Sequence, residues 1–308
     1  MFMIIALGFV IGACLGSLSL CLATRALKHK SFWGRSYCLD CKQNLHWYDL
    51  FPVLSYIFLR GKCRYCSKPL SREYILVELL MGGLVAYLFF QQFTPNVIQA
   101  LASVHDLASW PNTFLPAFLL SLVFKLFVLS ILAAVFITDI KAGLIPDELT
   151  LPAALITVIY QVLIIVINIG LMTWGLAQSV LGKYLLPPHT NYIWVHSWVF
   201  MQPFLWTLLT TLIITLFFGG LIFITRGRGM GGGDLKLGVF LGLALGFPNA
   251  ILALLLAFFL GSLVGTGLIL IRKKHFGQTI PFGPFLALGS LCALFWGEKI
   301  IAWYISIN

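Results

Sequence analysis

Apolar runs long enough to cross a lipid bilayer are the feature that most constrains the fold of this chain. A spanning helix needs about 20 predominantly apolar residues, and in lipid only helices and closed barrels satisfy the backbone hydrogen bonds. Only 10% of the residues are charged, against about a quarter in soluble domains. The sequence therefore predicts an all-α polytopic membrane protein with about eight transmembrane helices. The runs lie at 2–24, 74–93, 115–138, 148–171, 204–225, 251–271 and 284–306, with a shorter, glycine-rich one at 235–249.

Basic residues gather beside alternate runs. All of the 20 lysines and arginines except Lys125, Lys183 and Lys299 lie in 25–73 or at the polar ends of later runs, among them Arg228 and the basic cluster 272–274. Because positively charged loops remain on the cytoplasmic side, these segments are predicted to face the cytoplasm. The formal net charge of +10 is then explained by topology and anionic headgroups. No nucleic-acid partner is expected.

The chain divides into three expected parts: a first transmembrane helix at 1–24, a polar cytoplasmic domain at 25–73, and a multi-helix membrane domain at 74–308. The first run has no basic region before it, so we expect a retained helix rather than a cleaved signal peptide. Two outer loops are expected at 94–114 and 172–203. The second carries Pro187-Pro188 and several aromatic residues of the kind that anchor at interfaces.

The polar domain carries two Cys-x2-Cys pairs, Cys38 with Cys41 and Cys63 with Cys66. Two thiolates separated by two residues fit adjacent vertices of a tetrahedron, so the four sulfurs indicate a structural Zn²⁺ site. Unligated or transiently oxidised cysteines, including those of a membrane thiol-redox protein, are the alternative. His46 lies between the pairs and is more typical of a solvated loop histidine than of a fifth ligand.

Two aspartates lie where apolar runs meet polar segments. Asp139 follows AVFIT and is expected to open a short loop, and Asp234 closes the glycine-rich loop GMGGGD. A carboxylate at the edge of a bilayer is costly and is a functional candidate. Two of them on one membrane face suggest a proton-sharing catalytic pair. Helix capping, topology anchoring, or the proton or cation site of a transporter remain alternatives.

Glycines beside Asp234 permit the close approach of another backbone, so they are candidates for a substrate-binding loop: Gly231, Gly232 and Gly233. Asp147 competes for a catalytic role, but its position after Ile145-Pro146 favours the start of a helix. Three further charged residues could orient substrate or form interfacial ion pairs: Arg60, Glu78 and Lys236.

Several motifs resemble those of one enzyme family across nearly the whole chain: RSYCLDC, HWYDLFPVLSYIFLRGKCRYC, SREYILVELL, TDIKAGLIPDELTLP, GMGGGDLKLG and IPFGPFLALG. The chain resembles type IV prepilin peptidases, whose GxGD signature matches Gly231 to Asp234. The first cysteine pair lacks a proline that relatives often carry, and the segment 172–203 is longer than is usual in the family.

The resemblance implies a bifunctional enzyme of the bacterial inner membrane. Asp139 and Asp234 would be the catalytic aspartates, facing the cytoplasm. The substrates would be type IV pilus prepilins and type II secretion pseudopilins, whose short basic leader is cut after a glycine. The new N-terminal residue would then be methylated by S-adenosyl-L-methionine, whose site the sequence does not place beyond the 25–73 segment and nearby loops.

Overall fold

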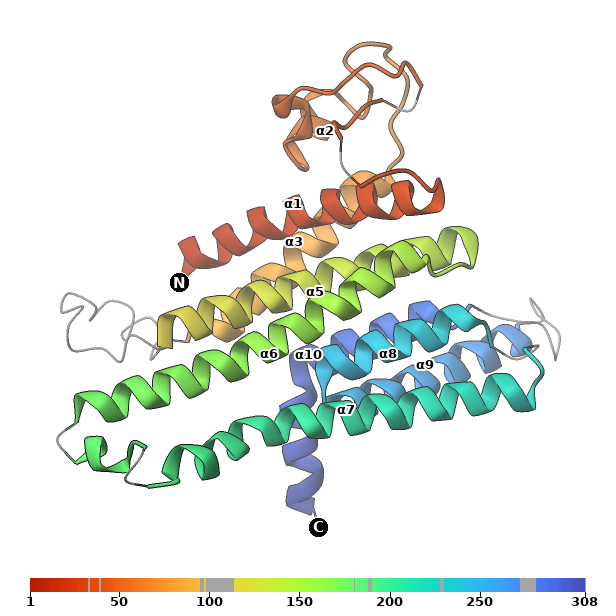
Figure 1. Cartoon of the computed structure of the whole chain (residues 1–308). Coiled ribbons are helices and arrows are strands. Elements are labelled where there is room, and N and C mark those ends of the chain that lie inside the picture. The colour runs from red at the N-terminus through yellow and green to blue at the C-terminus, as the bar shows by residue number, and fades with distance from the viewer. Residues whose placement is uncertain are drawn as a thin grey trace. The chain divides into compact units, whose positions relative to one another are not determined.

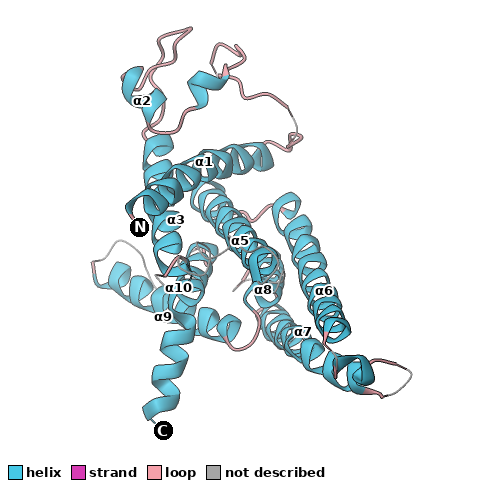
Figure 2. Ribbon diagram, turned by 90° about the vertical axis from the view of Figure 1, so that its left-hand side faces the viewer, coloured by secondary structure: helices cyan, strands magenta, loops and turns pink. Residues whose placement is uncertain are grey.

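The computed structural model of the chain describes residues 1–32, 34–38, 40–94, 97, 114–179, 181–187, 190–227, 230–271 and 281–307. Of the features named above, Arg228, Gly229, Pro188, the basic cluster 272–274 and most of the outer loop 94–114 lie outside this part. Helices account for nearly all regular structure in the described residues, which hold no strand (Figure 2). The prediction of an all-α protein is confirmed.

Seven of the described helices are long and apolar enough to cross a membrane (Figure 1). They are α1 (Phe2–Leu27), α3 (Glu73–Gln92), α5 (Phe114–Ala142), α6 (Asp147–Gln178), α7 (Tyr192–Ile224), α9 (Asn249–Leu270) and α10 (Gly283–Ile307). The shorter run expected at 235–249 is α8 (Gly232–Leu245), with 14 residues. Three short elements complete the described chain: η1 (Trp47–Leu50), α2 (Leu54–Phe58) and η2 (Gly182–Leu185).

The expected outer loop at 172–203 is wrong in its bounds. Helix α6 continues to Gln178 and α7 begins at Tyr192, so most of that segment is helical. The aromatic residues that suggested an interfacial loop also continue the helix, and Pro203 is accommodated inside α7. The connection is confined to residues 179–191, around Pro187 and η2.

Two compact units make up the chain. The first comprises residues 1–110 together with 129–138 of α5, and its main contact joins α1 to α3. Glycines one turn apart on α1 allow this approach: a Cβ atom at Gly12 would lie 2.7 Å from Cβ of Val85 and 2.9 Å from Cα of Gly82. Small residues spaced in this way let membrane helices pack backbone to backbone.

The second unit comprises residues 111–128 and 139–308. Helix α8 contacts α6, α7, α9 and α10, and its Leu237 and Phe240 are fully buried. Its close contact with α7 depends on Gly238, where a Cβ atom would lie 2.5 Å from a ring carbon of Phe218. The helix that carries Asp234 therefore forms the core of this unit.

Candidate functional site

Asp139 lies in the last turn of α5, which continues to Ala142. The expectation that it opens a loop is wrong, because the residues after it continue the helix. The helix ends where Gly143 adopts a positive φ of 61°. The Asp139 side chain is buried, with 4% of its surface exposed.

The first turn of α10 contacts the Asp139 carboxyl group. The backbone N–H of Gly283 donates a hydrogen bond to it, and a Cβ atom at Gly283 would lie 2.9 Å from Cγ of Asp139. The second carboxyl oxygen, Oδ2, is buried and has no hydrogen-bond partner in the described part of the chain. Buried polar atoms are nearly always paired, so this oxygen is an open acceptor or donor position.

Asp234 lies in the first turn of α8 rather than at the end of a loop, which corrects the second boundary. The helix begins earlier because Gly231, in an extended conformation, serves as its N-cap, and a carboxylate in the first turn interacts favourably with the helix dipole. The charge of Asp139 acts on the Asp234 carboxyl group. The fold thus brings together two residues that are far apart in the sequence.

Ile145, in the α5–α6 loop, lies beside both aspartate-bearing segments. Its Cβ would lie 3.1 Å from a Cβ atom added at Gly233, and its Cδ1 3.2 Å from one added at Gly283. By contrast, no atom of the described residues lies within 4 Å of a Cβ atom at Gly232. Gly232 and Gly233 belong to the first turn of α8, so only Gly231 of the three predicted loop glycines lies before the helix. The helix start is open at Gly232, whereas Gly233 is enclosed. None of the three predicted loop glycines has a positive φ.

Asp147 is the first residue of α6, so the predicted first-turn position is confirmed. Its two carboxylate oxygens each accept a hydrogen bond of 2.6 Å from Nζ of Lys236 on α8. This ion pair ties the start of α6 to the helix that carries Asp234. This pairing also explains the position of Lys236 without assigning it a role in catalysis.

The four predicted cysteine ligands converge in the first unit. The ligand atoms of Cys38, Cys41, Cys63 and Cys66 lie within 4.8 Å of one another, an arrangement that could hold a metal ion. Each cysteine pair lies in a turn with the same backbone hydrogen-bond pattern. The N–H of Cys38 donates to Gln43 O at 3.0 Å, and that of Cys63 to Lys68 O at 2.8 Å. His46 is not part of this group.

Burial raises the pKa of the Cys63 thiol, but hydrogen bonds from the backbone N–H groups of Cys66 and Tyr65 and from neighbouring thiols outweigh it and lower that pKa to about 7. A thiol that ionises readily is suited to binding a metal, because the thiolate is the ligand.

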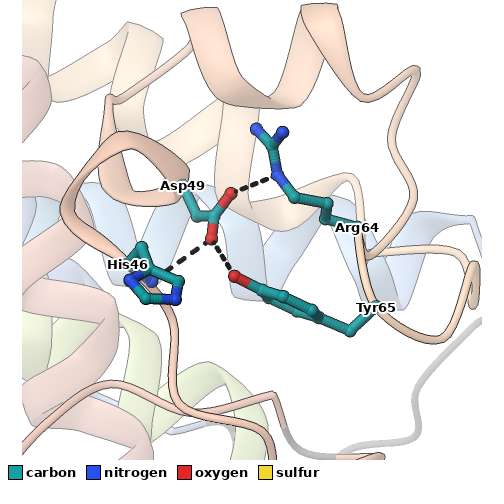
Figure 3. A network of polar contacts seen from close by, with 4 residues as sticks. All are labelled: His46, Asp49, Arg64 and Tyr65. Carbon is teal, nitrogen blue, oxygen red and sulfur yellow. Dashed lines mark hydrogen bonds and ion pairs between the residues drawn. The ribbon is translucent and has the colours of Figure 1, made fainter.

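A carboxylate network braces the second cysteine turn (Figure 3). Asp49, from η1, accepts hydrogen bonds from Nε of Arg64 at 2.7 Å and from the Tyr65 hydroxyl at 2.9 Å, and also from the backbone N–H of His46 at 3.2 Å. Burial would raise the pKa of Asp49, but these partners outweigh it and hold the pKa below its usual range. Arg64 and Tyr65 are the two residues between Cys63 and Cys66, so the network fixes that turn.

Sequence reasoning missed three residues of these sites. Gly283 lies in the conspicuous IPFGPFLALG segment, which is a signal that could have directed attention to it. Ile145 and Asp49 also lie in motifs quoted above, TDIKAGLIPDELTLP and HWYDLFPVLSYIFLRGKCRYC. Their importance depends on partners that only the fold brings near.

Two protein-family models match segments of this chain. The bacterial peptidase A24 N-terminal domain matches residues 10–92, which include the cysteine cluster. The type IV leader peptidase family matches residues 126–266, which include Asp139 and Asp234. With the helical fold, these matches define a multi-pass membrane peptidase.

Curated relatives match most of the chain. Proteins named prepilin leader peptidase/N-methyltransferase from Aeromonas hydrophila and Legionella pneumophila are 31% and 30% identical, covering 88% and 91% of this chain and 75% and 78% of their own lengths. A protein of the same name from Stutzerimonas stutzeri is 28% identical, covering 89% of this chain and 76% of its own. No solved structure matches. The chain belongs to the type IV leader peptidase family, as its motifs indicated.

Proposed function

We propose that this protein removes the short basic leader from type IV prepilins and type II secretion pseudopilins, cutting after a glycine, and then methylates the new N-terminal residue. Relatives named prepilin leader peptidase/N-methyltransferase match most of the chain. The family match and the seven candidate spans support a place in the inner membrane.

The observation that carries the peptidase proposal is the buried, unpartnered Oδ2 of Asp139 within electrostatic reach of Asp234. As a catalytic pair the two carboxyl groups would share one proton, since two neighbouring carboxyl groups cannot easily both be ionised. The ionised member takes a proton from water as that water attacks the scissile carbonyl carbon. The protonated member donates a hydrogen bond to the carbonyl oxygen. The C–N bond then breaks as the proton taken from water passes from the aspartate pair to the leaving amine nitrogen. The two aspartates titrate as one unit, so the two roles are assigned to the pair and not to a particular residue.

Approach of the substrate is expected from the side of Gly232, where the backbone is open. An extended peptide could approach the backbone there, at the start of α8, without meeting a side chain of these glycines. The positive charge of the adjoining segments supports a cytoplasmic site. The basic leader would then remain at the headgroups while the apolar helix of the pilin lies in the bilayer.

The cysteine cluster fits a structural Zn²⁺ ion. With Zn–S bonds of about 2.3 Å, the sulfurs of a tetrahedral site lie roughly 3.8 Å apart, and the Sγ atoms of Cys38 and Cys66 are 4.0 Å apart. We infer that zinc holds together the two turns of the cytoplasmic domain. The second cofactor, S-adenosyl-L-methionine, supplies the methyl group when bound.

The product of the purified enzyme tests this proposal. A prepilin is incubated with wild type in detergent, with and without S-adenosyl-L-methionine, and the product is read by mass spectrometry. We expect a cut after the leader glycine, followed by a gain of one methyl group only when the cofactor is present. Absence of any cut with several prepilins, from enzyme that is folded and contains zinc, would refute the proposal.

A further inference from the structure

An exposed apolar face lies on the 25–73 segment, outside the seven candidate spans. Trp47 of η1 is 73% exposed and Phe58 of α2 is 81% exposed, and three further large apolar side chains beside them are exposed: Phe51, Leu54 and Ile57. The rings of Trp47 and Phe51 contact each other, with centroids 5.9 Å apart. Most other exposed large apolar residues of the described chain belong to the spans, where lipid would cover them. This face therefore needs a cover of its own.

The two sides of α2 have different surroundings. Ser55 and Tyr56 line a cavity of about 230 Å³ in the first unit. Residues three and four positions apart share one face of a helix, so Leu54, Ile57 and Phe58 project together from the other side. None of these three lines the cavity. The fold of the segment thus uses one side of α2 and leaves the apolar side uncovered.

A hydrogen bond fixes this face at the level of a spanning helix. The backbone N–H of Val53, directly before α2, donates to the Glu78 carboxylate at 2.7 Å. Glu78 is buried and lies five residues into α3, about 7.5 Å along the helix axis. Val53 has a φ of 62°, which a β-branched residue adopts only under constraint. Figure 1 shows α2 to the side of α1 and α3 rather than beyond their ends. The apolar face therefore lies at the depth where the apolar run of α3 begins.

Basic residues adjoin the face. Arg60 and Lys62 follow α2 directly, are exposed, and form no ion pair among the described residues. The 25–73 segment as a whole holds ten lysines and arginines against three acidic residues. Anionic headgroups attract basic residues beside a spanning helix, and tryptophan concentrates at the membrane–water interface. A second copy of this chain, or the basic leader of a substrate, would add positive charge to the same surface, so an anionic lipid surface fits it better.

We propose that the face formed by Trp47, Phe51, Leu54, Ile57 and Phe58 inserts into the interface of an anionic bilayer. Arg60 and Lys62 then bind the lipid phosphates. Helices α1 and α3 anchor the two ends of the 25–73 segment, and the inserted face holds its middle against the same membrane surface. This inference goes beyond the proposed peptidase and methyltransferase activities and depends on neither.

Lipid photocrosslinking of the full-length enzyme tests the proposal. The enzyme is placed in nanodiscs of phosphatidylcholine, alone or mixed with phosphatidylglycerol, which contain a trace of phospholipid with a diazirine near the glycerol end of one acyl chain. Trypsin cuts after Lys42 and Arg60 and so releases the whole face in one peptide, residues 43–60. In wild type we expect lipid adducts on this peptide, and more of them in the anionic nanodiscs. Adducts on the spanning helix α3 provide the internal reference.

The test variant is Phe58→Ser, which removes an exposed ring and keeps both trypsin sites. Its adducts on the 43–60 peptide should fall several-fold relative to α3, since burial of one phenylalanine side chain favours the inserted state by roughly tenfold or more. The matched control is Tyr48→Ser in the same peptide, because the Tyr48 ring stacks on His46 and contacts Arg64. Its labelling should equal that of wild type.

Absence of adducts on the 43–60 peptide of wild type, or equal labelling of wild type and Phe58→Ser, would overturn the proposal. Equal labelling with and without phosphatidylglycerol would refute the part assigned to Arg60 and Lys62. Loss of the adducts on addition of a prepilin would assign the face to the substrate instead of to lipid.

Discussion

Gly283→Ala should disable the peptidase while leaving the rest of the molecule intact. The added Cβ atom would lie 2.9 Å from Cγ of Asp139, and closer still to Oδ2. Ordinary van der Waals contact begins at about 3.4 Å, so relief requires a movement of roughly 0.5–1 Å. Since Asp139 is 4% exposed, it has little room to move without leaving its proposed catalytic position. A misplacement of about 1 Å can cost about 10²-fold in rate.

We therefore expect kcat/KM for prepilin cleavage to fall by about 10²-fold in Gly283→Ala, measured from the rate of leader release. Zinc content should not change, because the cysteine cluster belongs to the other unit. Gly267→Ala is the matched control, since nothing lies within 4 Å of a Cβ atom there. Cleavage at the wild-type rate by Gly283→Ala would show that the contact with Asp139 does not position the carboxyl group.

Three further predictions concern the first unit. Cys38→Ser should lower zinc stoichiometry by elemental analysis, whereas Cys292→Ser, outside the cluster, should not; equal zinc in both would contradict the ligand assignment. Asp49→Asn should destabilise the 25–73 segment more than Asp40→Asn, whose ion pair with Lys68 is largely exposed. The lowered pKa of Asp49 means that its stabilisation is present above the ordinary carboxyl pKa and is lost as pH falls through the folded-state value. The thermal unfolding curves of wild type and Asp49→Asn should therefore converge as the pH is lowered. Curves that stay apart in acid would refute this. Gly12→Ala should cost about 1–3 kcal/mol by forcing α1 from α3, and Gly83→Ala, with open space around it, serves as its control in detergent unfolding.

The sequence predicted the helices well because a bilayer demands long apolar segments, and such segments are visible without any partner. Helix ends were less predictable. Asp139 was expected in a loop because it follows an apolar run, and Asp234 because it follows a glycine-rich segment, yet both lie within the terminal turns of helices. Polar residues in those turns are compatible with helix, so a change in composition marks the membrane boundary rather than the end of the helix.

The candidate sites also contain features that the sequence predicts and features that it does not. Cysteine spacing specifies a local turn geometry, and the four predicted ligands do converge. Contacts between distant segments could not be predicted, because nothing in the residues near Asp139 points to Gly283. Glu78 illustrates the limit most clearly. Its buried carboxylate accepts hydrogen bonds from Val53 of the 25–73 segment and from Ser17 of α1, and neither is visible as a partner in the sequence.

The central claim is that Asp139 and Asp234 act as one unit on one peptide bond. Prepilin cleavage rates of Asp139→Asn, Asp234→Asn and the double variant test it most directly, with Asp147→Asn as a control that keeps both aspartates. If the pair acts together, each single variant should lose nearly all activity and the double variant no more than either. Substantial cleavage by either single variant, or losses that multiply in the double variant, would contradict the account.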